Sequence, residues 1–177
     1  MVMAKYRVLI AYGTKTEFTQ AIAEEVAAVL REDGLDVEVR PAAEIVSVGP
    51  YDAVVLGGEL RANRWHRDAR RFARRHSAQL RSRPVWFFSS GTSDASDASK
   101  DGGADVPPVP SARRAMNQTG ARGHLTVGGR PGRLPRGLFD RGGAARSSAA
   151  RDLLADHPEM FRVRDWAHHI ANEVTGS

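Results

Sequence analysis

Three short apolar runs constrain the fold of this chain more than any other feature. They occupy residues 8–11, 53–56 and 85–88. None approaches the roughly 20 apolar residues that span a bilayer, and each has the length of a strand buried on both faces. Because helical patterns separate the runs, the sequence predicts β-α-β units, a parallel sheet and helices on both faces of that sheet.

Apolar stripes at helical spacing predict the helices between the strands. They cover residues 18–30, 69–80 and 166–174. Alternation of polar and apolar residues over 36–40, followed by Pro41, predicts an edge strand. A weaker strand is expected over 124–127, and a short helix over 111–118.

Two stretches without periodicity interrupt this alternation. Residues 91–111 are rich in Ser, Asp, Gly, Ala and Pro, and we interpret them as a long mobile loop. Residues 128–150 are dominated by Gly, Arg and Pro, and they indicate an irregular insertion. No internal repeat or second core is visible, so a single domain over residues 1–177 is expected.

Composition excludes several kinds of site. The chain has no cysteine, which excludes disulfides, iron–sulfur clusters, thiolate metal sites and cysteine nucleophiles. No pair of histidines has convincing metal-ligand spacing, so no metal site is expected. The first residues lack the pattern of a secretory signal, and a cytoplasmic location is the simplest expectation.

The charge is positive and unevenly distributed. The net charge is +5, and residues 61–83 contain nine arginines and one acid, Asp68. This basic stretch favours an acidic partner or anionic lipid, although an arginine-rich chain is also typical of a GC-rich genome. Nucleic acid is not expected as a partner, because aromatic residues are not interleaved with the arginines.

The loop after the first run is the strongest candidate for a ligand site, because open parallel sheets bind ligands at the carboxyl ends of their strands. It comprises Thr14, Lys15, Thr16, Glu17, Phe18 and Thr19. Helix-start amides and three threonine hydroxyls favour a phosphate monoester. Ordinary helix capping explains the same threonines, and the Walker and Gly-x-Gly-x-x-Gly patterns are both absent.

Two further loops follow the next two runs. Residues 57–66 contain Gly57 and Gly58, which allow close approach of a flat ligand, and Trp65, which can stack on an aromatic ring or pack on the domain. Residues 89–94 offer amides and short hydroxyls around Gly91 that suit the polar edge of an isoalloxazine ring.

Taken together, these blocks resemble the flavodoxin-like family. The matching blocks are residues 8–16, 57–58, 64–66, 84–91, 120–124, 128–130 and 164–166. Within the family, the chain resembles the branch of menaquinone-dependent protoporphyrinogen oxidase and actinobacterial flavodoxin-domain proteins. The resemblance implies a three-layer, doubly wound α/β sandwich with a five-stranded parallel sheet in the order 2-1-3-4-5.

The resemblance also implies non-covalent FMN. Its phosphate is expected on Thr14, Thr16, Thr19 and the Lys15 amide, within loop 14–19. The flavin ring is expected between two groups of residues. They are Gly58, Glu59, Leu60 and Trp65 on one side, and Ser89, Ser90, Gly91, Thr92 and Asp94 on the other. Trp65 would flank the ring, and Ser90, Gly91 and Thr92 would bond its polar edge.

Two departures from the family pattern bear on function. Glu17 replaces a glycine of the phosphate loop, so FMN binding is expected to be weak unless this carboxylate points away or pairs with Lys15. Residues 134–148 hold Gly, Ala, Ser and Arg where that branch carries an amphipathic membrane-associating helix. At most peripheral membrane contact is expected, and porphyrin oxidation at a membrane is poorly supported.

Three functions remain open from the sequence. The first is an FMN-dependent oxidoreductase with a small-molecule or quinone acceptor, and the second is an electron carrier for a redox protein partner. The third is a flavodoxin-fold binding module that has lost FMN. No residue is assigned as catalytic, since His66 beside the expected flavin is better explained as a polar residue at a helix start than as a proton donor. A homodimer is also left open.

Overall fold

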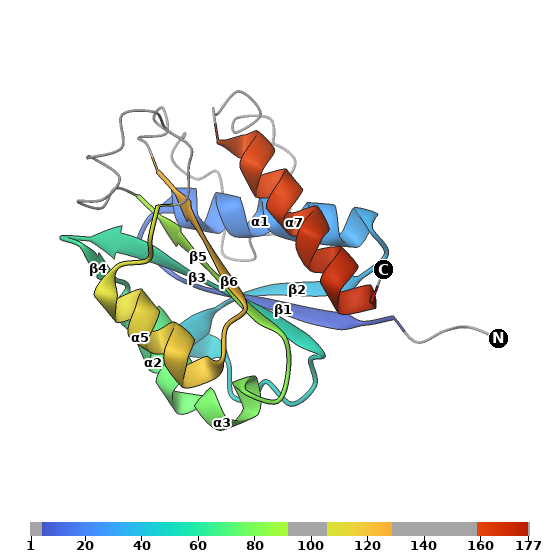
Figure 1. The fold of residues 1–177 in the computed structure, drawn as a ribbon, viewed down its shortest axis with the longest axis horizontal. Coiled ribbons are helices and arrows are strands. Elements are labelled where there is room, and N and C mark those ends of the chain that lie inside the picture. Colours follow the sequence, from blue (N-terminus) through green and yellow to red (C-terminus); the bar gives the residue numbers. More distant parts are fainter. Residues whose placement is uncertain (1–4, 92–105, 129–158, 177) are drawn as a thin grey trace.

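The computed structural model describes residues 5–91, 106–128 and 159–176. Five parallel strands cross its centre in the order β2-β1-β3-β5-β6 (Figure 1). Their bounds are β1 Arg7–Gly13, β2 Asp36–Pro41, β3 Ala53–Arg61, β5 Val85–Ser90 and β6 Gly123–Val127. This order confirms the predicted sheet, to which the structure adds a short sixth strand.

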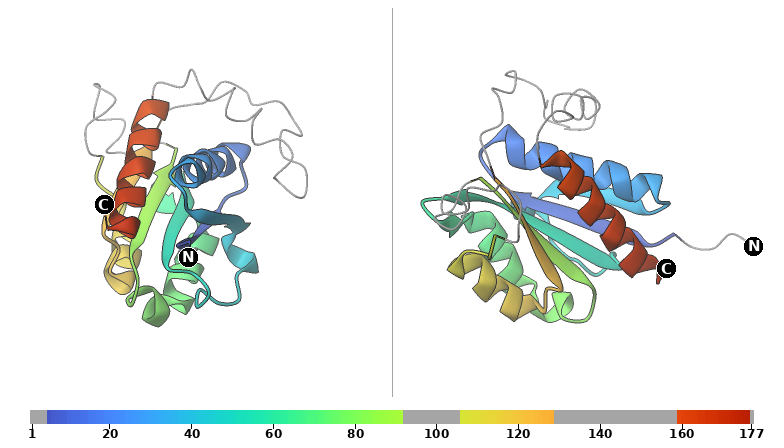
Figure 2. Two further views of the ribbon diagram at one scale, coloured as in Figure 1. Left: turned by 90° about the vertical axis from the view of Figure 1, so that its right-hand side faces the viewer. Right: turned by 45° about the horizontal axis from the view of Figure 1, so that its top comes forward.

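Helices cover both faces of the sheet. Their bounds are α1 Glu17–Glu32, α2 Arg67–Arg75, α3 Ser77–Leu80, α5 Pro110–Thr119 and α7 Met160–Thr175, with a 3₁₀ turn, η1, at Ala42–Glu44. Helices α1 and α7 lie on one face, and α2, α3 and α5 lie on the other (Figures 1 and 2). The three-layer, doubly wound architecture is thus confirmed.

The central strands have no polar face, because each face packs on helices. In β1, Val8 and Ile10 join the core beneath α1 and α7, whereas Leu9 and Ala11 join the core beneath α2 and α5. All four side chains are fully buried. Burial on both faces explains why the strand reads as a continuous apolar run rather than an alternating one.

The predicted helix over 69–80 is wrong in one respect, because it is divided at His76. This residue ends α2 and precedes α3, with a φ of −106° outside the helical range. The residue is 6% exposed, and burial, followed by the charge of Arg75, lowers the pKa of its imidazole. The apolar stripe continues across the break, which is why the sequence pattern does not show it.

The interpretation of residues 57–66 as a loop is also wrong. Strand β3 continues to Arg61, turns at Ala62 and Asn63, and pairs antiparallel with β4, Arg64–Trp65. Both turn residues have positive φ, 47° and 60°, as in a type I′ hairpin turn. Because the usual Asn-Gly signal is absent here, no local pattern indicates a hairpin.

Two of the predicted irregular regions fall largely outside the described residues. The expected mobile loop over 91–111 includes residues 92–105, and the expected insertion over 128–150 lies within 128–158, of which only Gly128 is described. Among the residues that are described, no helix has both the length and the apolar character needed to cross a membrane.

Candidate functional site

The site lies where the chain order of the sheet reverses, between β1 and β3. From β1 the chain proceeds to β2 on one side, and β3 lies on the other side. Gly13 ends β1 against the start of α2, where a Cβ would come within 2.8 Å of the Ala69 nitrogen and 2.9 Å of His66 Nδ1. A glycine is therefore needed for the following loop to leave the sheet beside α2.

The loop after β1 is ordered by its own threonines. Thr14 Oγ1 accepts a hydrogen bond from the Thr16 N–H at 2.8 Å, and the two hydroxyls lie 3.1 Å apart. Thr16 is the N-cap residue of α1, yet its side chain makes no capping hydrogen bond. Helix capping by Thr16, the alternative left by the sequence, is therefore not what this residue does in the structure.

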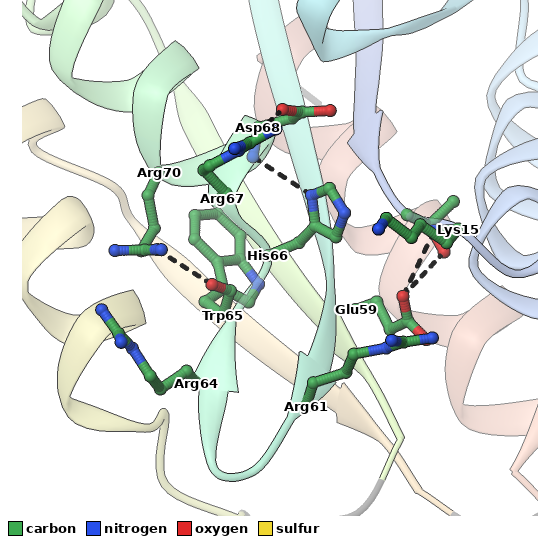
Figure 3. A pocket seen from close by; sticks show the side chains of 10 residues that line it. Lys15, Glu59, Arg61, Arg64, Trp65, His66, Arg67, Asp68 and Arg70 are labelled. Carbon is green, nitrogen blue, oxygen red and sulfur yellow. Dashed lines mark hydrogen bonds and ion pairs between the residues drawn. The ribbon is translucent and has the colours of Figure 1, made fainter.

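Glu59 brings a carboxylate to the same loop. Its Oε2 accepts a hydrogen bond from the Lys15 N–H at 3.3 Å and lies 3.4 Å from the Thr14 hydroxyl, whose closer acceptor is the Thr16 carbonyl at 3.1 Å. Arg61 Nε lies 3.5 Å from Oε1 (Figure 3). The residue is 8% exposed. The family pattern predicted Glu59 beside a flavin, but it did not show that Glu59 reaches the phosphate loop. Glu17, the other carboxylate of the loop, is half-buried at the start of α1.

Thr19 and Ser90 join α1 to the end of β5 under this loop. Their hydroxyl oxygens lie 2.5 Å apart, and both residues are buried. Thr19 therefore points inward, toward the sheet, and its hydroxyl is already engaged. Phe18 beside it is 7% exposed and belongs to the core beneath α1 and α7.

Ser89 points to the opposite face of the sheet, because side chains alternate along a strand. Its Oγ is hydrogen-bonded to His124 Nε2 at 2.8 Å. Burial lowers the pKa of His124 to about 4, so the imidazole is neutral at pH 7. The sequence patterns left His124 without a role, since nothing local links it to Ser89.

The third predicted loop begins at Gly91, with a φ of +107°. Its N–H donates to the Val127 carbonyl at 2.9 Å, which ties the ends of β5 and β6 together. Ser89 and Ser90 are strand residues rather than loop residues. Thr92 and Asp94, the other residues expected at the polar edge of a flavin ring, lie outside the described residues.

Protein rings fill the space that the two glycines of β3 leave. A Cβ on Gly57 would lie 2.0 Å from the Phe88 ring, and one on Gly58 would lie 2.3 Å from Trp65 Nε1. Trp65 is 1% exposed and stacks on Phe87, with ring centroids 4.8 Å apart. Packing on the domain, the alternative role considered for Trp65, is the one seen. A stack on a ligand ring stays a prediction and requires the indole to move. Leu60 is likewise buried, in the core on the α2 side.

A pocket of about 350 Å³ opens between the first loop and the hairpin (Figure 3). Thr14, Lys15 and Glu59 line one side of it, and the hairpin and the first turn of α2 line the rest. His66 accepts a hydrogen bond from the Asp68 N–H at Nδ1, 3.1 Å away, and so caps α2. The helix-start role considered for His66 is therefore the role it has.

Tyr12 and Glu24 are two titratable groups to which the sequence patterns assigned no role in a site. Tyr12 is half-buried and Glu24 is buried. Burial, and then the charges of Glu24 and Glu44, raise the pKa of Tyr12 to about 12. Burial also raises the pKa of Glu24. Tyr12 stands at the end of β1 immediately before the loop, so its hydroxyl stays protonated there at neutral pH.

Comparison with known proteins finds a matching family model and curated relatives. The Flavodoxin domain model matches residues 9–134. Protoporphyrinogen IX dehydrogenase [quinone] of Escherichia coli K12 is 31% identical over 85 residues, which is 47% of this chain and 47% of that protein. The match thus spans about half the length of the curated relative.

Solved structures share the fold at low sequence identity. A flavodoxin from the domain Archaea has a TM-score of 0.64 at 12% identity, covering 96% of this chain and 99% of that one. Rubredoxin oxygen:oxidoreductase from Desulfovibrio gigas has a TM-score of 0.65 at 13% identity, covering 97% of this chain and 37% of that one. Oxidised flavodoxin 2 from Bacillus cereus scores 0.53 at 19% identity, covering 86% and 99%.

Proposed function

We propose, since this chain belongs to the Flavodoxin domain family of FMN-binding proteins, that it binds FMN and acts in electron transfer or oxidoreduction. FMN would supply the redox chemistry, which no protein side chain provides. The chain would bind the phosphate, orient the ring and limit access of water. The observation that carries the proposal is the convergence of donors at the first loop.

That convergence concerns Lys15 and Thr14. The Lys15 N–H donates to Glu59 Oε2 at 3.3 Å, and the Thr14 hydroxyl lies 3.4 Å from the same oxygen, with the Thr16 carbonyl as its closer acceptor at 3.1 Å. These donors therefore already face a single negatively charged oxygen. A phosphate oxygen has the same hydrogen-bonding needs, and the first turn of α1, which has no side-chain cap, adds its dipole. The residues present thus fit a phosphate monoester, provided that Glu59 turns away.

For the ring, the proposal uses the adjoining ends of β3 and β5. Gly58 pairs with Ser89 and Glu59 pairs with Ser90 across these parallel strands, so the two predicted groups of ring contacts are neighbours. The assignment of Ser90, Gly91, Thr92 and Asp94 to the polar edge of the ring stays a proposal. Thr19 would act indirectly, because its hydroxyl holds Ser90 rather than a ligand.

Absorption spectra and a fluorescence titration with FMN test the proposal. We expect FMN to gain a protein-shifted visible spectrum and its fluorescence to change in a saturable manner. A Thr14→Val variant should bind FMN about tenfold more weakly, since it loses one hydrogen bond to a charged group. If wild-type protein leaves FMN fluorescence unchanged at all concentrations, both redox functions are rejected.

A binding module that has lost FMN is the second candidate, and Glu59 favours it. Two carboxylates, Glu59 and Glu17, lie at the loop where a phosphate dianion would sit. Repulsion between like charges at short range opposes binding strongly in a sheltered site. If this candidate holds, the wild-type protein stays colourless, and FMN binding appears only once the Glu59 charge is removed.

The substrate and the partner also belong to the proposal. The name of the curated relative directs the first assays to quinones and porphyrinogens, although the match covers about half of that protein. Turnover with such a small molecule would indicate an oxidoreductase. Redox activity only in the presence of a reductase would indicate a carrier with a protein partner. A cytoplasmic location is proposed from the sequence and is testable by fractionation.

A further inference from the structure

A second hollow lies beside the hairpin, between α2 and α5. It measures about 120 Å³, and four arginines line it. They are Arg64 of β4, Arg70 and Arg74 of α2, and Arg114 of α5. We call these four residues the arginine groove. The other residues lining it are neutral, so no carboxylate faces the guanidinium groups within the described part of the chain.

The positive charge of the arginine groove has no counter-charge among the described residues. Its neighbours Arg61 and Arg67 lie near carboxylates, at 3.5 Å from Glu59 and 4.0 Å from Asp68. No ion pair joins the four groove arginines to any described carboxylate. Burial, and then the charges of the surrounding arginines, lower the pKa of Arg70. Like charges gathered in a concave surface focus a positive potential there.

Hydrogen bonds hold the groove in place before any ligand arrives. Arg70 Nε donates to the Trp65 carbonyl at 3.0 Å (Figure 3). The Trp65 N–H donates to Ser111 Oγ at 2.9 Å. Trp65 itself is buried against Phe87. One guanidinium is therefore fixed by a rigid strand that also contacts α5, which lowers the entropy lost when an anion binds.

We propose that the arginine groove is a binding site for an oxyanion group that carries at least two negative charges, either a diphosphate or a pair of carboxylates. Guanidinium groups match both chemistries, since each presents parallel N–H donors to two oxygens. Because three separate elements contribute arginines, the site recognises a compact group with oxygens on several sides. A singly charged anion would leave most of these donors unused.

The arginine groove adjoins the pocket at the first loop. Arg64 and Arg70 line both hollows, and they lie on the side of Trp65 away from Lys15 and Glu59 (Figure 3). A molecule anchored by its charged end in the groove can thus extend toward the reversal point of the sheet. The inference that such a ligand is a redox substrate or reductant rests on the proposed function.

Isothermal titration calorimetry with pyrophosphate and with glutarate tests the site without any flavin. The test variant is Arg74→Gln with Arg114→Gln, and the control is Arg75→Gln with Arg113→Gln. Each pair removes one arginine from α2 and one from α5 at neighbouring positions, so the change in net charge is identical. Arg75 and Arg113 are exposed and do not line the groove. Circular dichroism checks that the wild-type protein and both variants are folded.

We expect the wild-type protein to bind at least one probe, and the test variant to bind it about tenfold more weakly or worse. The control should change by less than about threefold, as expected for distant screened charges. Preference for pyrophosphate or for glutarate identifies the chemistry of the ligand. Equal losses in both variants, or no binding by the wild-type protein, would overturn the proposal.

FMN titrations of the same variants keep the two proposals apart. The groove lies outside loop 14–19, so FMN affinity should stay within about threefold in both variants. A selective loss of FMN affinity in Arg74→Gln with Arg114→Gln would show that the groove serves the flavin phosphate, and the separate site would be rejected. If the wild-type protein does not bind FMN, the redox function is rejected, but anion binding stays measurable.

Discussion

The carboxylate of Glu59 accepts a hydrogen bond from the backbone N–H of Lys15, with 3.3 Å between Oε2 and the nitrogen. The two residues come from different strand ends, and Glu59 is 8% exposed, so water screens the interaction little. Arg61, 3.5 Å from the other carboxylate oxygen, offsets part of the charge. An internal anion thus occupies donors that a ligand phosphate would need.

Replacing this carboxylate should strengthen FMN binding. Glu59→Gln keeps the size of the side chain but removes the charge and leaves Arg61 without its partner. Unit charges about 4 Å apart interact by about 4 kcal/mol at an effective dielectric of 20. Because Glu59 can turn away, we expect Glu59→Gln to recover only part of this repulsion energy. The gain should be about 1.4 kcal/mol, which is a tenfold lower Kd for FMN in a fluorescence titration.

Riboflavin is the control for this effect, since it has the same ring but no phosphate. Its affinity should be the same for the wild-type protein and for Glu59→Gln within a factor of about two, because no charge interacts with Glu59. A gain for riboflavin equal to that for FMN would show that Glu59 acts on the ring instead. Unchanged FMN affinity would show that the carboxylate does not compete with phosphate.

The buried hydroxyl pair of Thr19 and Ser90 should stabilise the protein. Their oxygens are 2.5 Å apart, and neither residue is more than 1% exposed. Ser90→Ala leaves the Thr19 hydroxyl without this partner and should lower the free energy of unfolding in urea by about 1–3 kcal/mol. Adding Thr19→Val should cost less than the sum of the single changes, because both polar groups are then gone. Strict additivity would contradict the coupling.

The central strands were predictable because their signal is local. Residues 8–11 and 85–88 are apolar on both faces of the sheet, and such continuous runs occur where helices cover both faces. The end of β3 was not predictable in this way. Its sequence there, Gly-Gly-Glu-Leu-Arg, has weak strand propensity, and pairing with β5 and β4 determines its conformation instead.

The candidate site shows the same division. The sequence predicts that loop 14–19 lies between a buried strand and the start of a helix. It also predicts that this loop favours an anion. Contact between Glu59 and Lys15 joins residues 44 positions apart, and the arginine groove joins three elements. The arginines can be counted in the sequence, but only packing decides which of them line one hollow.

The glycines of β3 should be intolerant of side chains even without a ligand. An added Cβ on Gly58 would lie 2.3 Å from Trp65 Nε1, and this indole is fixed by its stack on Phe87. We expect Gly58→Ala to lower the free energy of unfolding by about 1–3 kcal/mol. Gly49→Ala, at an exposed turn, is the control and should change it by less than about 0.5 kcal/mol. Equal effects would mean that Trp65 moves freely.

Acid should destabilise the protein in part through His124. Burial disfavours the charged imidazole and lowers its pKa from the ordinary value of 6.5, expected for the unfolded chain, to about 4 in the folded protein. Above pH 6.5 both states are neutral and the group has no effect. Between pH 6.5 and 4 the unfolded state binds the extra proton, so stability falls with decreasing pH, by at most about 3 kcal/mol.

Urea unfolding of His124→Gln across this pH range measures that contribution. The glutamine still reaches a hydrogen-bond partner such as Ser89 but does not titrate, so the loss of stability toward pH 4 should be smaller than in the wild-type protein. His76, whose pKa is also lowered by burial, should still cause some loss of stability toward pH 4 in this variant. Identical profiles for His124→Gln and the wild-type protein would contradict the shift.

The ion pair between α1 and α7 should matter far more than those at the surface. Arg164 Nε lies 2.7 Å from Glu25 Oε1, and the Glu25 side chain is 0% exposed, whereas that of Arg164 is 44% exposed. Arg164→Gln removes this ion pair of a buried carboxylate, and breaking a fully buried pair costs about 3–5 kcal/mol. Since Arg164 is partly solvated, we expect a loss of about 2 kcal/mol in urea unfolding.

Two further variants establish that burial of Glu25 is the cause. Glu173→Gln breaks an exposed pair, with Arg122 Nη1 at 3.3 Å, and should cost less than about 1 kcal/mol. Glu25→Gln combined with Arg164→Gln should recover much of the loss, because no charge is then left buried. If the double variant is as unstable as the sum of the single ones, then packing of the Arg164 stem, rather than its charge, holds α7 against α1.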